Sequence, residues 1–184
     1  MHTIFSRVNN VSAFLSSCLM SLVLAVAIAS ALYQTYQTPP AAGVVVNSIK
    51  VLPGKGRYLR KYRSRQQQEF AFVNFNLTAD LSPLFHWNTK QLFLYVSAEY
   101  TDQQGTANEV VIWDRIVRRK EDANISSTFK NKYHLKDMST TFRKAPPAHY
   151  TLKYNLMPYV GLLAWGEAAR TSEPIPFPEP HQLA

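Results

Sequence analysis

A run of 23 residues without a charged side chain, Val11 to Tyr33, places the strongest limit on how this chain can fold. An α-helix of that length extends over about 35 Å, because each residue adds about 1.5 Å. That is enough to cross the hydrocarbon core of a bilayer, which is about 30 Å thick. A cleaved signal peptide is the alternative, since Ala27-Ile28-Ala29 resembles a cleavage site, but the apolar core of a signal peptide has only about 7–15 residues. We therefore predict an uncleaved signal-anchor helix over residues 11–33.

The charged residues nearest to this segment predict its direction. Arg7 and the α-amino group precede the segment, and no Lys, Arg, Asp, Glu or His occurs between Arg7 and Lys50. Positive charges within about 15–20 residues of a membrane helix mark its cytoplasmic side. We therefore predict a type II membrane protein with a cytoplasmic N-terminus over residues 1–10, a spacer over 34–42 and a domain outside the cytosol over 43–184.

Two glycosylation sequons, at Asn76 and Asn124, agree with this direction. Both fit the pattern Asn-x-Ser/Thr, which marks a glycan acceptor on the surface of a secreted domain. Asn124 follows the polar residues Glu121 and Asp122 and is expected in a loop, so we favour it as the acceptor. Asn76 falls within a strand pattern and is the second candidate.

The formal charge of +8 comes from one short segment rather than from the whole chain. Seven of the 20 Lys and Arg residues lie between Lys50 and Arg65, where no acidic residue occurs. Three interpretations of this basic loop, 50–65, stay open: a solvated loop, a contact with acidic lipid headgroups or with an acidic patch on a partner subunit, and a nucleic-acid site. Because nucleic acid is not an expected partner outside the cytosol, we predict no nucleic-acid binding.

Beyond the spacer, apolar residues alternate with period two, which indicates β-strands. In Phe70–Ala79 and in His149–Leu156 every second residue is apolar, so each is expected to be a strand with one wet face. Thr101–Gly105 has the composition of a hairpin turn, and residues 174–184 form a proline-rich tail. The predicted fold is mainly β, an antiparallel β-sandwich behind one transmembrane helix, with strands over Val44–Leu52, Phe70–Ala79, Gln91–Tyr100, Glu109–Val117 and His149–Leu156.

Two of these strands are apolar on both faces. Phe93 and Tyr95 lie opposite the apolar row of Gln91–Tyr100, and Val111 and Trp113 lie opposite the other apolar row of Glu109–Val117. A strand that is apolar on both faces is covered on both faces. Either another part of this chain covers the second face, or these four residues contact a partner protein.

The chain carries no motif of a known catalytic or cofactor site: H-E-x-x-H, G-x-S-x-G, the P-loop and G-x-G-x-x-G are all absent from the sequence. The five histidines lack metal-ligand spacing, and His86 between Phe85 and Trp87 is expected to be a packed structural residue. The single cysteine, Cys18, excludes a disulfide framework. We predict no cofactor, no metal and no catalytic residue, although a dispersed Ser-His-Asp set would leave no motif.

One contiguous block, DLSPLFHWNTKQLFLYVSAEY over residues 80–100, resembles the signature of signal peptidase complex subunit 3, a family of accessory subunits of the endoplasmic reticulum signal peptidase. Two later elements are similar to that family: Trp113-Asp114-Arg115-Ile116, and an Asn-x-x-Pro-x-x-Gly pattern. His86 departs from the family, which usually has Asp or Asn there. The residues that carry the resemblance are Asp80, Trp87, Asn88, Lys90, Gln91, Glu99, Tyr100, Trp113, Asp114, Asn155, Pro158 and Gly161.

The resemblance implies that this chain has an accessory function and no catalytic activity of its own. Members of the family are not expected to hold the catalytic serine, which belongs to a separate subunit, and are expected to stabilise and position that subunit at the luminal membrane surface for removal of signal peptides. Expected partners are the catalytic and small membrane subunits and the lipid bilayer. The chain would lie in the endoplasmic reticulum membrane with its bulk luminal. A membrane-anchored luminal hydrolase and a surface adhesion or binding β-sandwich are the alternatives.

Overall fold

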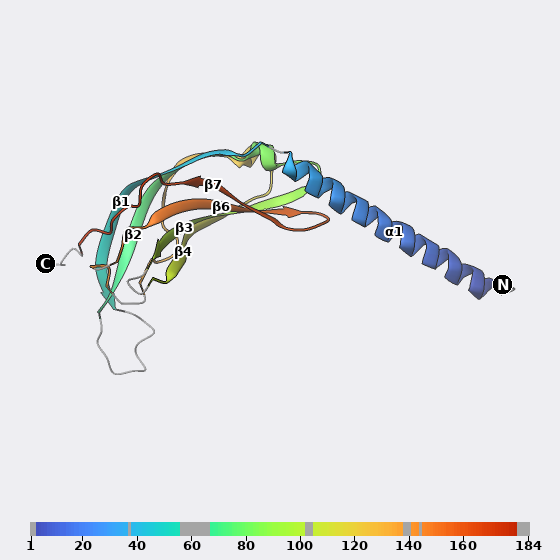
Figure 1. The fold of residues 1–184 in the computed structure, drawn as a ribbon, viewed down its shortest axis with the longest axis horizontal. Helices are drawn as coiled ribbons and strands as arrows, with labels where there is room; N and C mark the ends of the chain where they lie inside the picture. Colours follow the sequence, from blue (N-terminus) through green and yellow to red (C-terminus); the bar gives the residue numbers. More distant parts are fainter. Residues whose placement is uncertain are drawn as a thin grey trace.

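A computed structural model describes residues 3–36, 38–55, 67–101, 105–137, 141–143 and 145–179. It contains one long helix, α1 (Ile4–Thr35), which projects from a β-domain (Figure 1). Thr3 caps the helix, since its hydroxyl accepts a hydrogen bond from the Ser6 amide at 3.3 Å. Two serines inside the helix bond to its own backbone: the Ser17 hydroxyl donates to the Ala13 carbonyl at 3.0 Å and the Ser21 hydroxyl donates to the Cys18 carbonyl at 2.8 Å, which suits an apolar surrounding. The helix is long and apolar enough to cross a membrane, and it contains the whole of the predicted span.

The domain consists of two antiparallel sheets, which confirms the predicted fold class. The first sheet has the order β1-β2-β5 and the second the order β4-β3-β6-β7. All five predicted strands are present, each somewhat longer than the sequence pattern indicated. The bounds are β1 Ala41–Lys55, β2 Gln67–Asp80, β3 Thr89–Thr101, β4 Ala107–Val117, β5 Asn124–Lys130, β6 His149–Pro158 and β7 Ala164–Arg170, with 3-10 turns η2 Ser82–Leu84 and η3 Lys120–Ala123.

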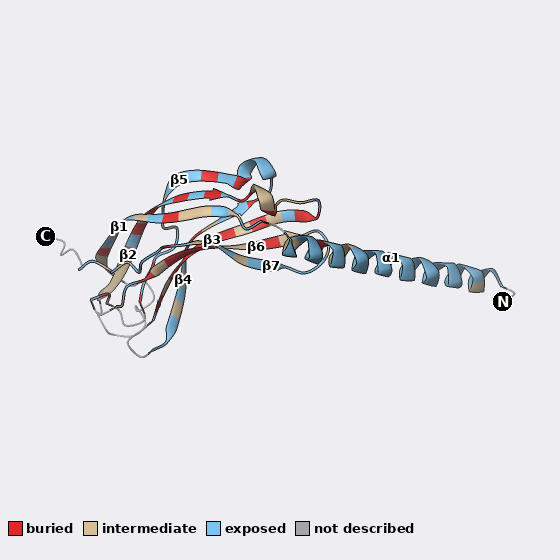
Figure 2. Cartoon of the chain, turned by 45° about the horizontal axis from the view of Figure 1, so that its top comes forward, coloured by how far each residue is buried: buried red, intermediate tan, exposed pale blue. Residues whose placement is uncertain are grey.

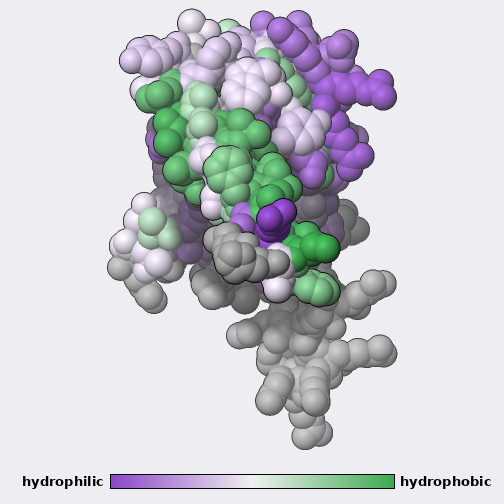
Figure 3. All heavy atoms as spheres, turned by 90° about the vertical axis from the view of Figure 1, so that its right-hand side faces the viewer, coloured by the Kyte–Doolittle hydropathy of each residue, from purple (hydrophilic) through white to green (hydrophobic). Residues whose placement is uncertain are grey.

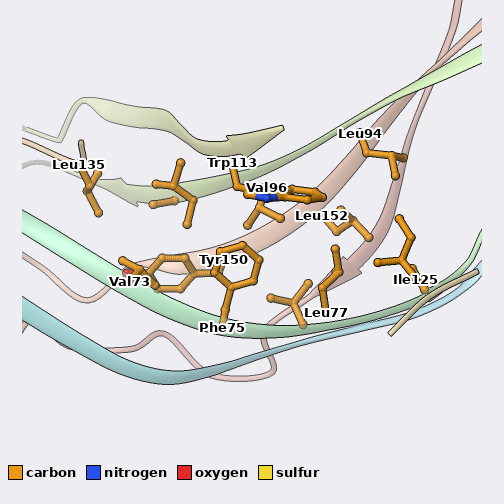
Figure 4. Packing of buried hydrophobic residues seen from close by; sticks show 14 of the residues in the cluster. Val73, Phe75, Leu77, Leu94, Val96, Trp113, Ile125, Leu135, Tyr150 and Leu152 are labelled. Atoms are coloured by element: carbon orange, nitrogen blue, oxygen red, sulfur yellow. The ribbon is translucent and has the colours of Figure 1, made fainter. Parts of the chain in front are cut away.

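The core lies between the two sheets, where the alternating apolar residues of the central strands meet (Figures 2 and 4). On β2, the inward row of Val73, Phe75 and Leu77 is fully buried. On β3, Leu92, Leu94 and Val96 are buried in the same way. Strands with one apolar row each can bury it only against a second layer, so the period-two pattern leads directly to the sandwich.

A β-bulge in β4 corrects one sequence-based assignment. Val96 pairs with Trp113 whereas Ser97 pairs with Val111, so Ile112 is an extra residue in β4. A bulge turns neighbouring side chains to the same face, and both Ile112 and Trp113 point into the core, where Trp113 is 5% exposed. The prediction that Val111 and Trp113 share an outer face is therefore wrong for Trp113.

The outer face of β6 is also drier than predicted. Thr151, expected to face solvent, is fully buried. Thr151 pairs with Ser97 of β3. The ion pair between Lys153 and Glu99 (2.6 Å) runs diagonally across this Ser97–Thr151 pair. Long charged side chains can cover small residues in this way while keeping their charged ends near water.

Three further segments differ from the predictions or lie partly outside the described residues. Residues 50–55 of the basic loop belong to β1, and residues 56–66 lie outside the described residues. Asn124 is the first residue of β5 rather than part of a loop, because η3 ends at Ala123 and the strand pairs at once with Asp80. In the proline-rich tail, Ile175 forms a bridge with Ala148, and residues 180–184 lie outside the described part of the chain.

Candidate partner interface

The outer surface of the β4-β3-β6-β7 sheet carries a group of apolar side chains close to the helix end of the domain. The rings of Phe93 and Tyr95 stack with centroids 5.7 Å apart. Ile116 pairs with Phe93 across β3 and β4, and its side chain is 47% exposed. Val111 is exposed on the same strand. We call these residues the outer apolar face: Phe93, Tyr95, Val111 and Ile116.

The opposite end of the same surface is charged. Lys153 of β6 forms ion pairs with Glu99 of β3 at 2.6 Å and Glu109 of β4 at 2.9 Å, and Arg170 of β7 lies 3.5 Å from Glu99. Burial lowers the pKa of Lys153, but its hydrogen bonds to the two glutamates outweigh burial and hold the pKa above its ordinary value. The hydrogen bond from Lys153 in turn lowers the pKa of Glu109. This ionic cluster joins all four strands.

The three histidines of the domain that the structure describes are packed against aromatic rings or backbone groups. His134 lies between Phe70 and Phe72, with ring centroids 5.6 and 5.8 Å away, and the Nδ1 atom of His149 is 3.2 Å from the Thr171 carbonyl oxygen. Burial lowers the pKa of His86. Within the described residues, no group of three or more His, Cys, Asp or Glu side chains is placed to hold a metal ion.

Residues that carry the family resemblance meet at the tip of the β6–β7 hairpin. The Asn88 amide donates to the Val160 carbonyl at 2.7 Å and accepts from the Val160 N–H at 3.1 Å, while the Tyr159 N–H donates to the Asn88 carbonyl at 2.9 Å. Pro158 ends β6. Gly161 has a φ of +114°, a conformation that side chains disfavour. Three predicted positions thus build one loop.

The remaining residues of the resemblance hold other parts of the domain. Asp80 accepts a hydrogen bond from the Ser82 amide at 3.0 Å and so supports η2, and hydrogen bonds from Ser82 lower its pKa. The Tyr100 hydroxyl donates to Asp137 at 2.8 Å, and Asp114 pairs with Lys132 at 2.7 Å. Of the others, Trp87 and Lys90 are exposed, Gln91 contacts Met157, Glu99 belongs to the ionic cluster, Trp113 lies in the core and Asn155 lies opposite Phe93.

The two sequons lie on the outer surface of the other sheet. Asn76 and Asn124 are both exposed, and Thr78 of the first sequon pairs with Ser126 of the second. The Asn76 side-chain oxygen accepts hydrogen bonds from Asn47 at 2.8 Å and from Thr128 at 2.7 Å. The two candidate glycan acceptors therefore share one surface, opposite to the outer apolar face.

Sequence reasoning missed Ile116 as a member of the outer apolar face. Strict period-two alternation placed Ile116 in the same row as Ile112, but the bulge reverses the alternation between them. Trp165 was also missed. It is 72% exposed, in a strand of only seven residues, where alternation is too short to indicate a face.

These features define a protein with one apolar helix and a β-sandwich domain whose two outer surfaces differ in polarity. The family model described as "Signal peptidase subunit" matches residues 1–180. The chain is 34% identical to signal peptidase complex subunit 3 of Caenorhabditis elegans over 180 residues, which cover 97% of this chain and 95% of the relative. It is 33% identical to the Saccharomyces cerevisiae protein of the same name over 172 residues (91% and 92%), and 29% identical to that of Homo sapiens over 187 residues (100% and 98%). The chain belongs to the signal peptidase subunit family, which confirms the resemblance found in its sequence.

Proposed function

We propose that this chain is a non-catalytic subunit of the signal peptidase complex in the endoplasmic reticulum membrane. It stabilises the catalytic subunit and positions it at the luminal membrane surface, so that signal peptides are removed from nascent secretory proteins. Its partners are the catalytic and small membrane subunits. Membership of the signal peptidase subunit family supports this function, and its relatives in Caenorhabditis elegans and Homo sapiens are named signal peptidase complex subunit 3.

The outer apolar face is the observation that carries the proposed mode of action. Apolar side chains grouped on the surface of a domain mark an interaction site, and the outer apolar face lies on the sheet without sequons. The other sheet carries both sequons on its outer surface, where a glycan would obstruct a protein partner. We infer that the catalytic subunit packs against the β4-β3-β6-β7 sheet through Phe93, Tyr95 and Val111, together with Ile116.

The alternative of a luminal hydrolase is not supported by the surroundings of the described histidines, which are aromatic rings and backbone groups. Contact of the basic segment 50–65 with acidic lipid headgroups or with an acidic partner patch stays a prediction. The same holds for the luminal position of the domain and for glycosylation at Asn124 or Asn76.

The substitution Phe93→Asp tests the proposed interface. A carboxylate at a partner contact would be buried without a counter-charge, which costs about 3–5 kcal/mol. At about 1.4 kcal/mol per tenfold, association should weaken by about two to three and a half orders of magnitude. Affinity purification of the tagged chain from detergent-solubilised membranes should recover little catalytic subunit, and preproteins should accumulate uncleaved.

Phe72→Asp is the matched control, because Phe72 also lies on a central strand and is 37% exposed, but on the sheet with the sequons. This variant should recover the partner subunits at the wild-type level. Equal recovery with Phe93→Asp would place the interface elsewhere. A thermal melt of each purified chain separates lost contact from lost fold: if Phe93→Asp unfolds the chain by itself, Phe93 serves the fold and the proposed interface is wrong.

A further inference from the structure

The tip of the β6–β7 hairpin, residues 159–163, lies beside the helix rather than beyond its end (Figure 1). A Cβ atom added to Gly161 would be 3.4 Å from the Cα and Cβ atoms of Ala27. Ala27 precedes the helix end at Thr35 by eight residues, which is about 12 Å along the axis. The hairpin tip therefore extends along α1 into the depth range that the predicted membrane span occupies.

The helix has one covered face at this level. Ser30 is the buried residue of α1, and Val26, Ala27 and Gln34 are half-buried. Residues three or four apart share a face of a helix, so these four residues form a single contact strip. Close to it, the rings of Tyr33 and His86 are 5.2 Å apart, which adds a second contact between helix and domain.

The side chains of the tip are apolar and exposed. No charged residue occurs between Lys153 and Glu167. Leu162 is 86% exposed, and Tyr159 and Leu163 are also exposed. Two tryptophans accompany them: Trp165 is 72% exposed and Trp87 is 60% exposed. Tryptophan and tyrosine are enriched where proteins cross the membrane surface. Figure 3, which views the molecule from the helix end, shows hydrophobic residues in front and hydrophilic residues gathered at one side.

Backbone groups of Tyr159 and Val160 in the tip are hydrogen-bonded within the protein, as a surrounding without water requires. Polar backbone groups are costly in lipid unless they are hydrogen-bonded. Asn88, itself 3% exposed, satisfies the N–H and the carbonyl of Val160 with its side chain and the N–H of Tyr159 with its own carbonyl. One buried side chain thus satisfies backbone groups that a loop normally leaves to water.

We propose that the β6–β7 hairpin tip inserts into the lipid bilayer next to α1. Leu162 and Leu163 reach the acyl chains, and Trp87 and Trp165 lie at the headgroups. Lipid is the occupant because the exposed side chains lie at the level of an apolar helix that crosses the membrane. The sandwich then has two attachments to the membrane, which fix its tilt as well as its distance. This inference depends on α1 spanning a bilayer, but neither on the direction of the span nor on assembly with other subunits.

The test uses the full-length chain in phosphatidylcholine vesicles without any other protein. Cys18 is the single cysteine, so Cys18→Ser provides a background for Leu162→Cys labelled with a nitrobenzoxadiazole fluorophore. The matched control is Ala107→Cys, an exposed position at the start of β4, at the far end of the sandwich. An apolar segment bound at a membrane surface lies about 5–10 Å into the headgroup and acyl boundary, so nitroxide lipids should lower the emission of the label at residue 162 by about twofold.

The label at residue 107 should instead be quenched by aqueous iodide and not by nitroxide lipids. If the label at residue 162 behaves like the one at residue 107, the tip lies in water and the proposal is wrong. It is equally wrong if the label becomes shielded only after peptidase subunits are added, since a protein then occupies the tip. Leu163→Cys repeats the measurement at a neighbouring position. Because no peptidase subunit is present in the first measurement, before any is added, its result is independent of the proposed function.

Discussion

At the scale of single residues, Asn88 connects two parts of the domain that are far apart in the chain. It lies just before β3, and its side chain bonds to Val160, 72 residues later. The Asn88 side chain is buried. If it is removed, the N–H and carbonyl of Val160 lose their hydrogen-bond partner, and no water replaces it. This makes Asn88 the residue whose loss should most disturb the hairpin tip.

Asn88→Ala should lower the free energy of unfolding by about 2–4 kcal/mol, because buried polar groups left without partners cost about 1–3 kcal/mol each. Lys90→Ala is the control, since Lys90 is exposed two residues further on and surface changes usually stay within about 0.5 kcal/mol. Urea unfolding of the full chain in detergent micelles, followed by tryptophan fluorescence, measures both. Equal midpoints for the two variants would show that the Asn88 side chain does not hold the tip.

At the scale of elements, the ionic cluster joins the four strands of the second sheet. Lys153 stands between Glu99 and Glu109, which lie opposite each other on β3 and β4. Removal of the cation would leave two carboxylates facing each other, and like charges directly across a strand pair are destabilising. The cluster therefore depends on its central lysine.

Lys153→Met should lower the free energy of unfolding by about 1–2 kcal/mol, less than for a fully buried pair because the side chains of the cluster are 21–46% exposed. Lys132→Met should have little effect, since the Lys132 side chain is 54% exposed beside Asp114. Denaturant titrations at low and at high salt check the origin of the difference, which should shrink at high salt. A loss that is the same at both salt concentrations would point to packing rather than to charge.

At the scale of the whole molecule, the two outer surfaces of the sandwich have different chemistry. One bears the ionic cluster and the outer apolar face, and the other bears both sequons. Of the two acceptors, Asn76 lies in the middle strand and its side-chain oxygen is already bonded to Asn47 and Thr128. Asn124 begins an edge strand after a 3-10 turn, which leaves more room for a glycan.

Protease added to sealed microsomes should leave nearly the whole chain intact, because only residues before the helix would face the cytosol. Endoglycosidase should increase the electrophoretic mobility of the chain, and Asn124→Gln should remove most or all of that change, whereas Asn76→Gln should remove little. Digestion of the β-domain, or a mature N-terminus near Ser30, would contradict the type II orientation.

Features that depend only on residues close together in the sequence were predictable. The alternation in β2 indicated its inward row of Val73, Phe75 and Leu77, since a strand repeats every two residues whatever its partners are. The bulge at Ile112 was not predictable, because the extra residue is defined only by the strand opposite. Thr151 was expected on a wet face because the sequence does not show that the ion pair of Lys153 with Glu99 crosses over it.

The amino-acid sequence alone indicated an apolar helix long enough to cross a membrane and a sandwich of alternating strands, because both follow from local composition and period. It also identified the residues that build the hairpin tip, Asn88, Pro158 and Gly161, through their resemblance to a family. The approach of Gly161 to Ala27 and the surface that Phe93 shares with Ile116 follow from the folded arrangement and from no local pattern. The physical reason is that contacts between distant segments depend on how two sheets and a helix pack, and no local pattern records that arrangement.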